Sequence, residues 1–211
     1  MASKKKFYVV WEGKEPGIFD SWDKCKKSIE GYQGAKYKSF LTLEKAKEAF
    51  NGNPAEYIGK DIHESELSPE ELKRIGKPIL KSICVDAACS GAPGKMEYQG
   101  VFNFENVLLF RNGPFEDGTA NVGEFLAIVH ALAWCKKRNI NYPIYSDSKI
   151  AIKWVLDKKA KTKLVKNKKN EKLFDLIERA ENWLKNNTWD NALLKWETKA
   201  WGEIPADFGR K

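Results

Sequence analysis

Four acidic residues stand at positions where a carboxylate could do chemistry. Asp86 lies inside an apolar, strand-like segment, Glu124 follows a glycine at the expected start of a helix, and Asp147 directly follows the apolar segment 143–146. Asp207 lies in the C-terminal segment. A carboxylate within an apolar strand is costly to bury, so a positive charge is expected to meet Asp86. Oxygen ligands gathered without histidine or cysteine favour Mg²⁺ or Mn²⁺ over zinc.

Each of these acids, taken singly, also has a structural explanation. Glu124 would interact favourably with the dipole of its helix, Asp147 could cap the next helix, and Asp207 could be a solvated surface residue. Asp86 is the exception, because its segment is otherwise apolar. The prediction of a metal site therefore depends on the four acids occurring together.

The region from residue 79 onward alternates strand and helix patterns. Three strands in antiparallel succession, followed by alternating helices and strands, predict an α/β fold with a mixed five-stranded sheet flanked by helices. Short apolar runs indicate the strands, and apolar rows at i, i+3, i+4 and i+7 indicate the helices. The expected strands cover 82–88, 98–104, 107–111, 143–146 and 193–196, and the expected helices cover 124–138, 148–156 and 172–185.

The first part of the chain predicts a small, separate α/β unit at residues 1–50. Strands are expected at 7–11, 18–19 and 37–40, and helices at 21–29 and from 43 onward. Ser21 and Thr42 are placed to cap the two helices, and the second would present Leu43, Ala46 and Phe50 on one face.

Residues 51–78 predict a linker, with a helical turn near 69–75, because the segment is acidic and lacks sustained apolar periodicity. The larger domain then covers 79–211.

The net charge of +8 is unevenly distributed. Lys and Arg outnumber Asp and Glu by 11 to 7 over residues 1–50 and by 22 to 16 over 79–211, whereas residues 51–78 carry 4 basic and 6 acidic residues. Two basic blocks joined by an acidic stretch are typical of a protein that binds a polyanion.

The four cysteines include no C-x-x-C pair, so we expect free thiols in a reducing compartment. No apolar run reaches the length of a bilayer span, which predicts a cytoplasmic protein without a membrane partner.

Four segments resemble the successive active-site motifs of type 1 ribonuclease H, in the order of that family. They are VDAACSGAPG at 85–94, GTANVGEFLAI at 118–128, PIYSDSKIAIKW at 143–154 and LKWETKAWGEIPADFGRK at 194–211. Residues 7–50 are similar to the family's N-terminal hybrid-binding domain. The resemblance implies a ribonuclease H-like fold and an enzyme that cuts the RNA strand of an RNA–DNA hybrid.

The resemblance also implies roles for the acids. Asp86, Glu124, Asp147 and Asp207 would hold two Mg²⁺ ions about 4 Å apart, with Mn²⁺ as a substitute, and Asp86 would bridge both. Asp207 would help to hold the ion that activates water, and Glu124 and Asp147 the ion at the leaving oxygen. Cleavage would leave 5′-phosphate and 3′-hydroxyl ends. Without metal, mutual repulsion should raise the pKa of at least one acid.

The sequence departs from the family pattern at two places. The loop before the last aspartate usually carries a histidine, and here it carries Glu203, which the resemblance makes a candidate for tuning the second metal or assisting product release. The family's G-N-P-G turn is here Gly91-Ala92-Pro93-Gly94.

Substrate contacts are expected on both strands of the hybrid. Hydrogen bonds to RNA 2′-hydroxyls would come from Glu124, Asn121 and the stretch Cys89, Ser90 and Gly91. A pocket for a DNA phosphate would use Thr119, Asn121 and Thr162. Further candidates for substrate binding are Ser148, Lys149 and Lys163.

The segment 158–169 has seven lysines and no acid, and it either faces the nucleic acid or is a solvated loop. In the N-terminal unit, the similarity implies that Trp22 packs on a DNA sugar and that Lys38 meets a phosphate. Lys36 is a further candidate there. Tyr8, Trp22 and Phe40 could be either core or contact residues.

Two other functions stay open at this point. One is a non-catalytic hybrid-binding protein, against which the presence of all four acids argues. The other is a DNA nuclease of the same fold, of the resolvase or integrase type, for which the N-terminal motif has no evident use. The protein is expected to be monomeric and to have an RNA–DNA hybrid as its partner.

Overall fold

The computed structural model describes residues 6–59, 65 and 67–209. The chain divides into two compact units, Met1–Ser68 and Pro69–Lys211. Their boundary falls inside the segment 51–78 that the sequence indicates as a linker. Among the described residues, no helix combines the length and apolar character that a bilayer span requires.

The N-terminal unit is a three-stranded antiparallel sheet with two helices. The strand order is β2-β1-β3, and a small core of Val9, Phe40, Ala46 and Ala49 lies between the sheet and α2. The small side chains of the two alanines let the helix approach the sheet closely. The elements are β1 (Phe7–Glu12), β2 (Gly17–Phe19), α1 (Trp22–Ile29), β3 (Lys36–Phe40), α2 (Leu43–Asn51) and a 3₁₀ turn η1 (Pro54–Glu56).

Three details of this unit test the sequence predictions. Thr42 caps α2 as predicted, since its hydroxyl accepts a hydrogen bond from the amide of Lys45 at 3.2 Å. Ser21 occupies the N-cap position of α1, but its side chain makes no capping hydrogen bond. Phe50 is exposed rather than inward, and the buried face of α2 consists of Ala46 and Ala49. The packed unit also continues past residue 50, because Tyr57 stacks on Trp11 with ring centroids 5.8 Å apart.

The C-terminal unit contains the predicted mixed five-stranded sheet, with strand order β6-β5-β4-β7-β8. The first three strands pair antiparallel, whereas β4 pairs parallel with β7 and β7 parallel with β8. The strands are β4 (Ile83–Cys89), β5 (Gly94–Phe102), β6 (Val107–Gly118), β7 (Ile144–Ser146) and β8 (Leu193–Lys195). This topology brings the carboxyl ends of β4 and β7 to the same edge of the sheet.

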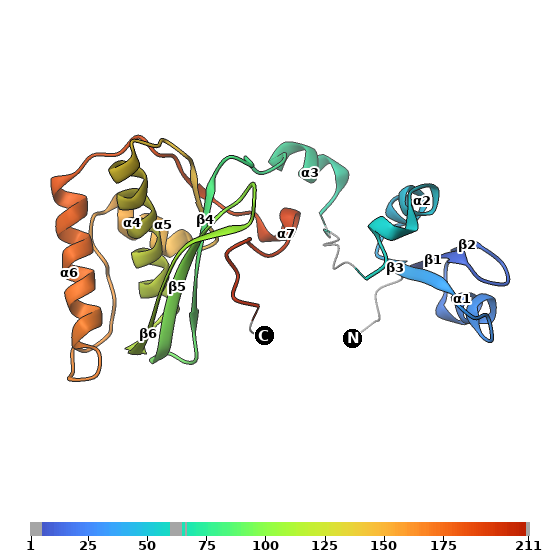
Figure 1. Cartoon of the computed structure of the whole chain (residues 1–211), viewed down its shortest axis with the longest axis horizontal. Coiled ribbons are helices and arrows are strands. Elements are labelled where there is room, and N and C mark those ends of the chain that lie inside the picture. The colour runs from blue at the N-terminus through green and yellow to red at the C-terminus, as the bar shows by residue number, and fades with distance from the viewer. Residues whose placement is uncertain (1–5, 60–64, 66, 210–211) are drawn as a thin grey trace. The chain divides into compact units, whose positions relative to one another are not determined.

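Helices cover both faces of this sheet. The main core lies under α4 (Ala120–Arg138), α5 (Lys149–Leu156) and α6 (Glu171–Asn186). The opposite face carries a smaller cluster that includes Cys84, Tyr145 and Trp196, and it lies toward α7 (Thr198–Trp201). Figure 1 shows the three long helices on one side of β4, β5 and β6, and α7 on the other. The helix α3 (Pro69–Ile75) is tied to α7, because the Trp201 indole donates to the carbonyl of Gly76 at 2.8 Å.

The main difference from the sequence prediction is the start of α4. The helix begins at Ala120, so Glu124 lies in its second turn and does not open it. Gly123, which suggested a helix start, instead allows close packing, since a Cβ at this position would lie 2.6 Å from the Cβ of Ala87 on β4. The glycine therefore sets how closely α4 approaches β4.

Candidate active site

Three of the four predicted acids converge at the edge of the sheet. Asp86 on β4, Glu124 on α4 and Asp147 after β7 each offer a carboxylate oxygen, and these oxygens all lie within 4.8 Å of one another. The parallel register pairs Val85 with Ser146, so Asp86 and Asp147 are each the next residue along the chain, Asp86 within β4 and Asp147 just after β7. Glu124 reaches the same point because Gly123 lets its helix pack against β4.

A buried serine orients Glu124. Ser146, the last residue of β7, is 1% exposed, and its hydroxyl donates to Glu124 Oε2 at 2.9 Å. The same hydroxyl accepts a hydrogen bond from the amide of Ser148 at 3.1 Å. Sequence reasoning missed Ser146 as part of the site. The available signal was a hydroxyl at the end of an apolar strand, next to an acid.

Burial and mutual repulsion disfavour the charged forms of these acids. Burial raises the pKa of Asp86 to about 6, and the negative charges of Asp147 and Asp207 add to the rise. Burial, the hydrogen bond with Asp86 and the nearby charges place the pKa of Glu124 well above its usual range. These shifts agree with the prediction that at least one acid should have a raised pKa without metal.

The positive charge expected beside Asp86 is not a side chain. Among the described residues, no lysine or arginine forms an ion pair with Asp86 or Glu124. The charges that act on Asp86 are those of the carboxylates of Asp147 and Asp207, and its hydrogen bonds are with Glu124 and the backbone of Ala87. Because the donors are all oxygen and include no histidine or cysteine, the cluster fits a hard divalent cation.

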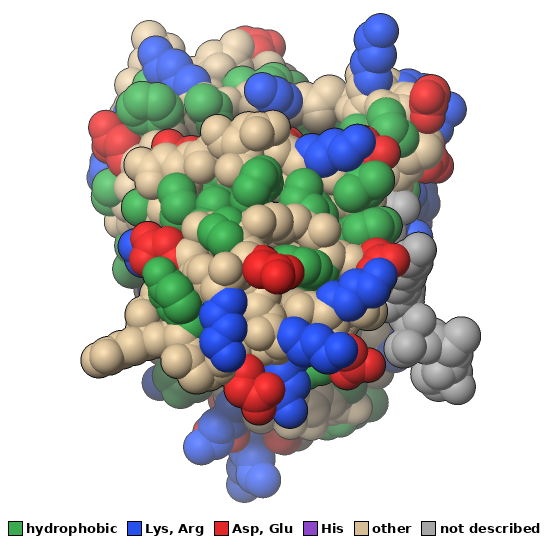
Figure 2. All heavy atoms as spheres, turned by 90° about the vertical axis from the view of Figure 1, so that its right-hand side faces the viewer, with side chains coloured by type: hydrophobic (Ala, Val, Ile, Leu, Met, Phe, Trp, Pro, Cys, Tyr) green, Lys and Arg blue, Asp and Glu red, His purple; other side chains and the backbone are tan. Residues whose placement is uncertain are grey.

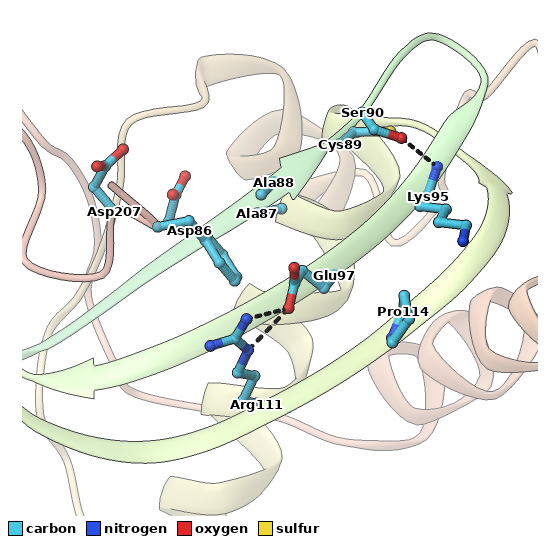
Figure 3. Close-up of a pocket in the computed structure, with 11 residues that line it drawn as sticks. Asp86, Ala87, Ala88, Cys89, Ser90, Lys95, Glu97, Arg111, Pro114 and Asp207 are labelled. Carbon is cyan, nitrogen blue, oxygen red and sulfur yellow. Dashed lines mark hydrogen bonds and ion pairs between the residues drawn. The ribbon is translucent and has the colours of Figure 1, made fainter. Parts of the chain in front are cut away.

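Asp207 lines the cleft beside this cluster. The cleft has a volume of about 770 Å³ and is formed by β4, β5, β6 and the C-terminal segment. Figure 3 shows Asp207 next to Asp86, with Arg111 and Glu97 joined across the neighbouring strands. Asp207 does not belong to the group of three acids whose oxygens lie within 4.8 Å, but its charge acts on Asp86. Glu203 is exposed in the loop after α7 and is not among the described residues that line the cleft.

The predicted RNA-contacting stretch lies at the rim of the same cleft. Cys89 and Ser90 line it. The Cys89 thiol donates to the carbonyl of Gly91 at 2.8 Å, and the Ser90 hydroxyl accepts from the amide of Lys95 at 2.9 Å. These contacts give the turn after β4 a fixed shape.

A second hollow, of about 510 Å³, gathers the residues predicted for the DNA phosphate. Its described lining includes Thr119, Asn121, Thr162 and Lys163. Two other candidates lie elsewhere. Ser148 caps α5 by accepting from the amide of Ala151 at 3.1 Å, and Lys149 lines a different hollow, with Lys153 and Lys195. The structure therefore does not bring Lys149 together with the phosphate candidates.

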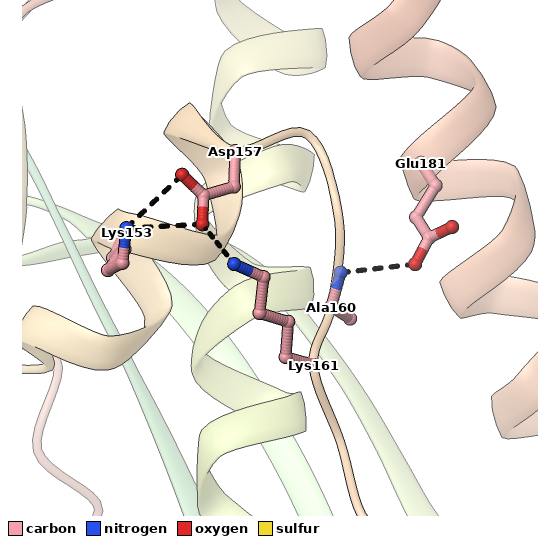
Figure 4. A network of polar contacts seen from close by, with 5 residues as sticks. All are labelled: Lys153, Asp157, Ala160, Lys161 and Glu181. Atoms are coloured by element: carbon pink, nitrogen blue, oxygen red, sulfur yellow. Dashed lines mark hydrogen bonds and ion pairs between the residues drawn. The ribbon is translucent and has the colours of Figure 1, made fainter.

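The lysine-rich segment 158–169 is an anchored loop. At its start, the buried carboxylate of Glu181 on α6 accepts from the amide of Ala160 at 3.1 Å and pairs with Lys159 at 2.6 Å. Asp157 pairs with Lys161 at 2.7 Å, and it also pairs with Lys153 on α5. Figure 4 shows Asp157 between the two lysines, with the Ala160–Glu181 bond beside them.

The lysines of this loop differ in their partners. Lys166 pairs with Asp175 at 3.7 Å, so at least three of the seven lysines have an acidic partner. Within the described part of the chain, Lys163, Lys168 and Lys169 form no ion pair. Lys161 and Lys163 both line the second hollow, but Lys161 is paired with Asp157, so Lys163 is the lysine better placed to meet a phosphate there.

The N-terminal unit presents three aromatic rings close together. Trp22 is 43% exposed, and its ring centroid lies 5.6 Å from that of Tyr8 and 5.9 Å from that of Tyr37. Figure 2 shows one face of the molecule, on which hydrophobic side chains lie among side chains of both Lys or Arg and Asp or Glu. Sequence reasoning missed Tyr37 as part of this group. Its strand is too short for the sequence pattern to show which of its side chains lie at the surface beside Trp22.

The structure decides between core and contact for Phe40, which is buried in the core at 2% exposure. Lys38 lies on the same strand, and its ammonium group donates to the carbonyl of Tyr57 at 2.9 Å. Lys36 pairs with Glu12 at 2.6 Å. Of the five residues predicted for this unit, Phe40 is therefore a core residue and not a surface contact.

Two family models match the chain. Residues 6–50 match the ribonuclease H1 N-terminal domain, and residues 81–196, more than half of the chain, match RNase H. Ribonuclease H of Saccharomyces cerevisiae is 32% identical over 99 residues, which cover 43% of this chain and 28% of that protein. Ribonuclease H of Crithidia fasciculata is 44% identical over 52 residues, which cover 25% of this chain and 10% of that protein. The matched part thus spans less than a third of each of these relatives.

Solved structures show a weaker likeness. RNase H1 from Halobacterium salinarum is 18% identical at a TM-score of 0.35, and the match covers 56% of this chain and 87% of that one. LC11-RNase H1, solved in complex with an RNA/DNA hybrid, is 19% identical at a TM-score of 0.34, covering 56% and 87%.

The fold and the site define a two-unit α/β protein whose larger unit holds an acidic cluster, suited to a divalent cation, at the edge of a mixed sheet. The chain belongs to the ribonuclease H family, and it carries the N-terminal domain of ribonuclease H1 ahead of its RNase H domain. The resemblance identified from the sequence motifs is confirmed.

Proposed function

We propose that the protein is an endoribonuclease that hydrolyses the RNA strand of RNA–DNA hybrids. The observation that carries the proposal is the group of Asp86, Glu124 and Asp147, of which the first two are buried and the third is half-buried. Their oxygens lie within 4.8 Å of one another, and no described lysine or arginine is paired with Asp86 or Glu124. Such a group is electrostatically costly unless a cation compensates it. Because the chain matches the RNase H family, we assign that cation to the hydrolysis of a phosphodiester bond.

The proposed metal is Mg²⁺, with Mn²⁺ as a substitute. Asp86, Glu124, Asp147 and Asp207 would hold two ions, which when bound supply charge stabilisation and an activated water for in-line attack. The protein's own residues keep the site arranged: Ser146 orients Glu124, and Asp86 and Glu124 are themselves buried. The expected products carry 5′-phosphate and 3′-hydroxyl ends.

A direct test compares three matched duplexes. The protein is incubated with RNA–DNA, DNA–DNA and RNA–RNA duplexes in Mg²⁺, and again with a chelator. Cleavage restricted to the RNA strand of the hybrid, and only with metal, supports the proposal. Cleavage of the DNA duplex would indicate a DNA nuclease of the same fold, and hybrid binding without cleavage would indicate a non-catalytic binding protein.

The N-terminal unit is proposed to bind the hybrid through its exposed aromatic rings. In the full chain carrying Asp147→Asn to prevent turnover, Trp22→Ala should weaken hybrid binding by about 1–3 kcal/mol, because a flat apolar contact is lost. Fluorescence anisotropy measures the effect. Tyr32→Ala, which removes another exposed ring outside the group of three, is the matched control. Equal losses in the two variants, or a circular dichroism spectrum showing that Trp22→Ala unfolds the unit, would contradict a contact role.

The second hollow is proposed to receive a DNA phosphate, with Lys163 as its cation. Lys163→Ala should reduce the slope of log affinity against log salt by about 0.9, because one phosphate contact releases one counterion equivalent. Lys166→Ala is the control, since Lys166 is already paired with Asp175. An unchanged slope for Lys163→Ala would remove this lysine from the interface.

We further propose that the protein is a monomer and that it acts in the cytoplasm. The basic character of both outer blocks supports the polyanionic partner, because a positive surface attracts nucleic acid over a distance of about one Debye length.

A further inference from the structure

The C-terminal tail, residues 202–209, packs on the face of the sheet opposite α4. Ile204 and Ala206 are buried there, against a cluster that includes Cys84 on β4 and Val101 on β5. The tail is the segment that carries Asp207. How it is held therefore decides where this carboxylate lies.

Three residues in one row of the sheet face this tail. Asp86 on β4 pairs in register with Gln99 on β5, and Gln99 pairs with Arg111 on β6. Residues directly opposite one another in antiparallel strands direct their side chains to the same face. A carboxylate, an amide and a guanidinium are therefore aligned beneath the tail.

The amide of Gln99 holds the backbone immediately before Asp207. Its Nε2 donates to the carbonyl of Ala206 at 2.7 Å, which joins residues 107 positions apart in the chain. Gln99 is 8% exposed and Ala206 is fully buried, so the bond forms out of bulk water, where an unpaired carbonyl would be costly.

Phe208, on the other side of Asp207, is held by Arg111. The Arg111 guanidinium lies 5.0 Å from the centroid of the Phe208 ring, and Glu97 holds it with two hydrogen bonds of 2.9 and 2.5 Å. Figure 3 shows this Glu97–Arg111 pair on β5 and β6, and Asp207 near Asp86. Both neighbours of Asp207 are thus fixed to the sheet.

We propose that Gln99 is a positioning residue for Asp207, which holds the tail so that this carboxylate faces Asp86 and completes the metal-binding group. The inference rests on the proposed metal-dependent nuclease function. A neutral amide suits this task, because it holds the tail without adding a cation that would compete with a metal for Asp207. The nearby cation, Arg111, forms an ion pair with Glu97, so its charge is directed to Glu97 and not to Asp207.

The test measures Mn²⁺ binding to the full chain by calorimetry, so it does not depend on turnover. Gln99→Met removes the amide donor at nearly constant volume. It should weaken Mn²⁺ binding by about 10- to 100-fold, as is typical for residues that orient metal ligands. In a protein already carrying Asp207→Asn, the same substitution should weaken binding by less than about twofold, because the ligand that it positions is gone.

Asn191→Leu is the matched control. The Asn191 side chain is a buried amide that donates to the carbonyls of Ile140 at 3.2 Å and Tyr142 at 2.9 Å, before β7. This variant should lower the thermal stability yet leave Mn²⁺ affinity unchanged. If Gln99→Met fails to fold by circular dichroism, Phe208→Ala replaces it in the same double-mutant cycle, with a loss in the same direction.

The proposal is overturned if Gln99→Met weakens Mn²⁺ binding equally in the parent and in the Asp207→Asn protein. It is also overturned if a folded Gln99→Met protein binds Mn²⁺ as tightly as the parent does. These outcomes are separate from the nuclease proposal. A parent protein that binds Mn²⁺ with this coupling, but cuts no hybrid, would refute the nuclease function and leave the positioning role of Gln99 standing.

Discussion

Asp86→Asn should stabilise the metal-free protein at neutral pH and at the same time abolish hybrid cleavage. The folded protein raises the pKa of Asp86 from 3.8 to about 6, chiefly through burial. The carboxyl group of Asp86 therefore holds its proton more tightly in the folded state than in the unfolded chain. The resulting stability is fully present below the unfolded pKa and is lost as pH rises through about 6, a change of about 3 kcal/mol.

Asparagine removes that pH dependence because it is neutral at every pH and similar in size. Chemical denaturation in a chelator, at several pH values between about 4 and 8, measures the difference between parent and variant. Added Mg²⁺ should stabilise the parent and have a much smaller effect on the variant. Asp190→Asn, at an exposed acid, is the control and should follow the parent. A metal-free Asp86→Asn protein less stable than the parent at neutral pH would show that the hydrogen bonds of Asp86 with Glu124 and with the backbone of Ala87 outweigh the cost of its burial.

Gly123→Ala should reduce both stability and cleavage, although alanine is the better helix former. In an unconstrained helix the change would stabilise by about 1 kcal/mol. Here the new Cβ would lie 2.6 Å from the Cβ of Ala87 and 2.7 Å from Sδ of Met96, closer than real Cβ atoms approach. Overpacking of this kind costs about 1–3 kcal/mol. The strain would also move α4 away from β4, and with it Glu124 away from Asp86.

The double variant Gly123→Ala with Ala87→Gly separates crowding from other causes. Removing the Ala87 methyl group returns part of the lost space, so stability and cleavage should both recover in part. Thermal unfolding and the cleavage rate measure the two effects. A Gly123→Ala protein as stable as the parent would mean that the contact between α4 and β4 relaxes freely. An absence of recovery in the double variant would place the strain at Met96.

The sequence predicted most elements because burial leaves a local pattern. The helix expected over 172–185 is α6, and the apolar residues of its inward row, Leu173, Ile177, Ala180 and Leu184, are all buried. The short helix α7 was missed, since four residues are too few to show a helical period. The start of α4 was placed late because a glycine inside a helix looks like an interruption until its neighbour across the sheet is known.

The sequence by itself determined the alternation of strands and helices, the four acids, and the motifs that identify the family. It could do so because periodicity, turn chemistry and motif order are properties of residues near one another in the chain. Only the tertiary structure decided that Phe40 is core, that Ser146 orients Glu124, and that Gln99 holds the carbonyl of Ala206. These contacts join residues 22 and 107 positions apart, or depend on packing between elements. The packing of helices and of the C-terminal tail against the sheets creates them.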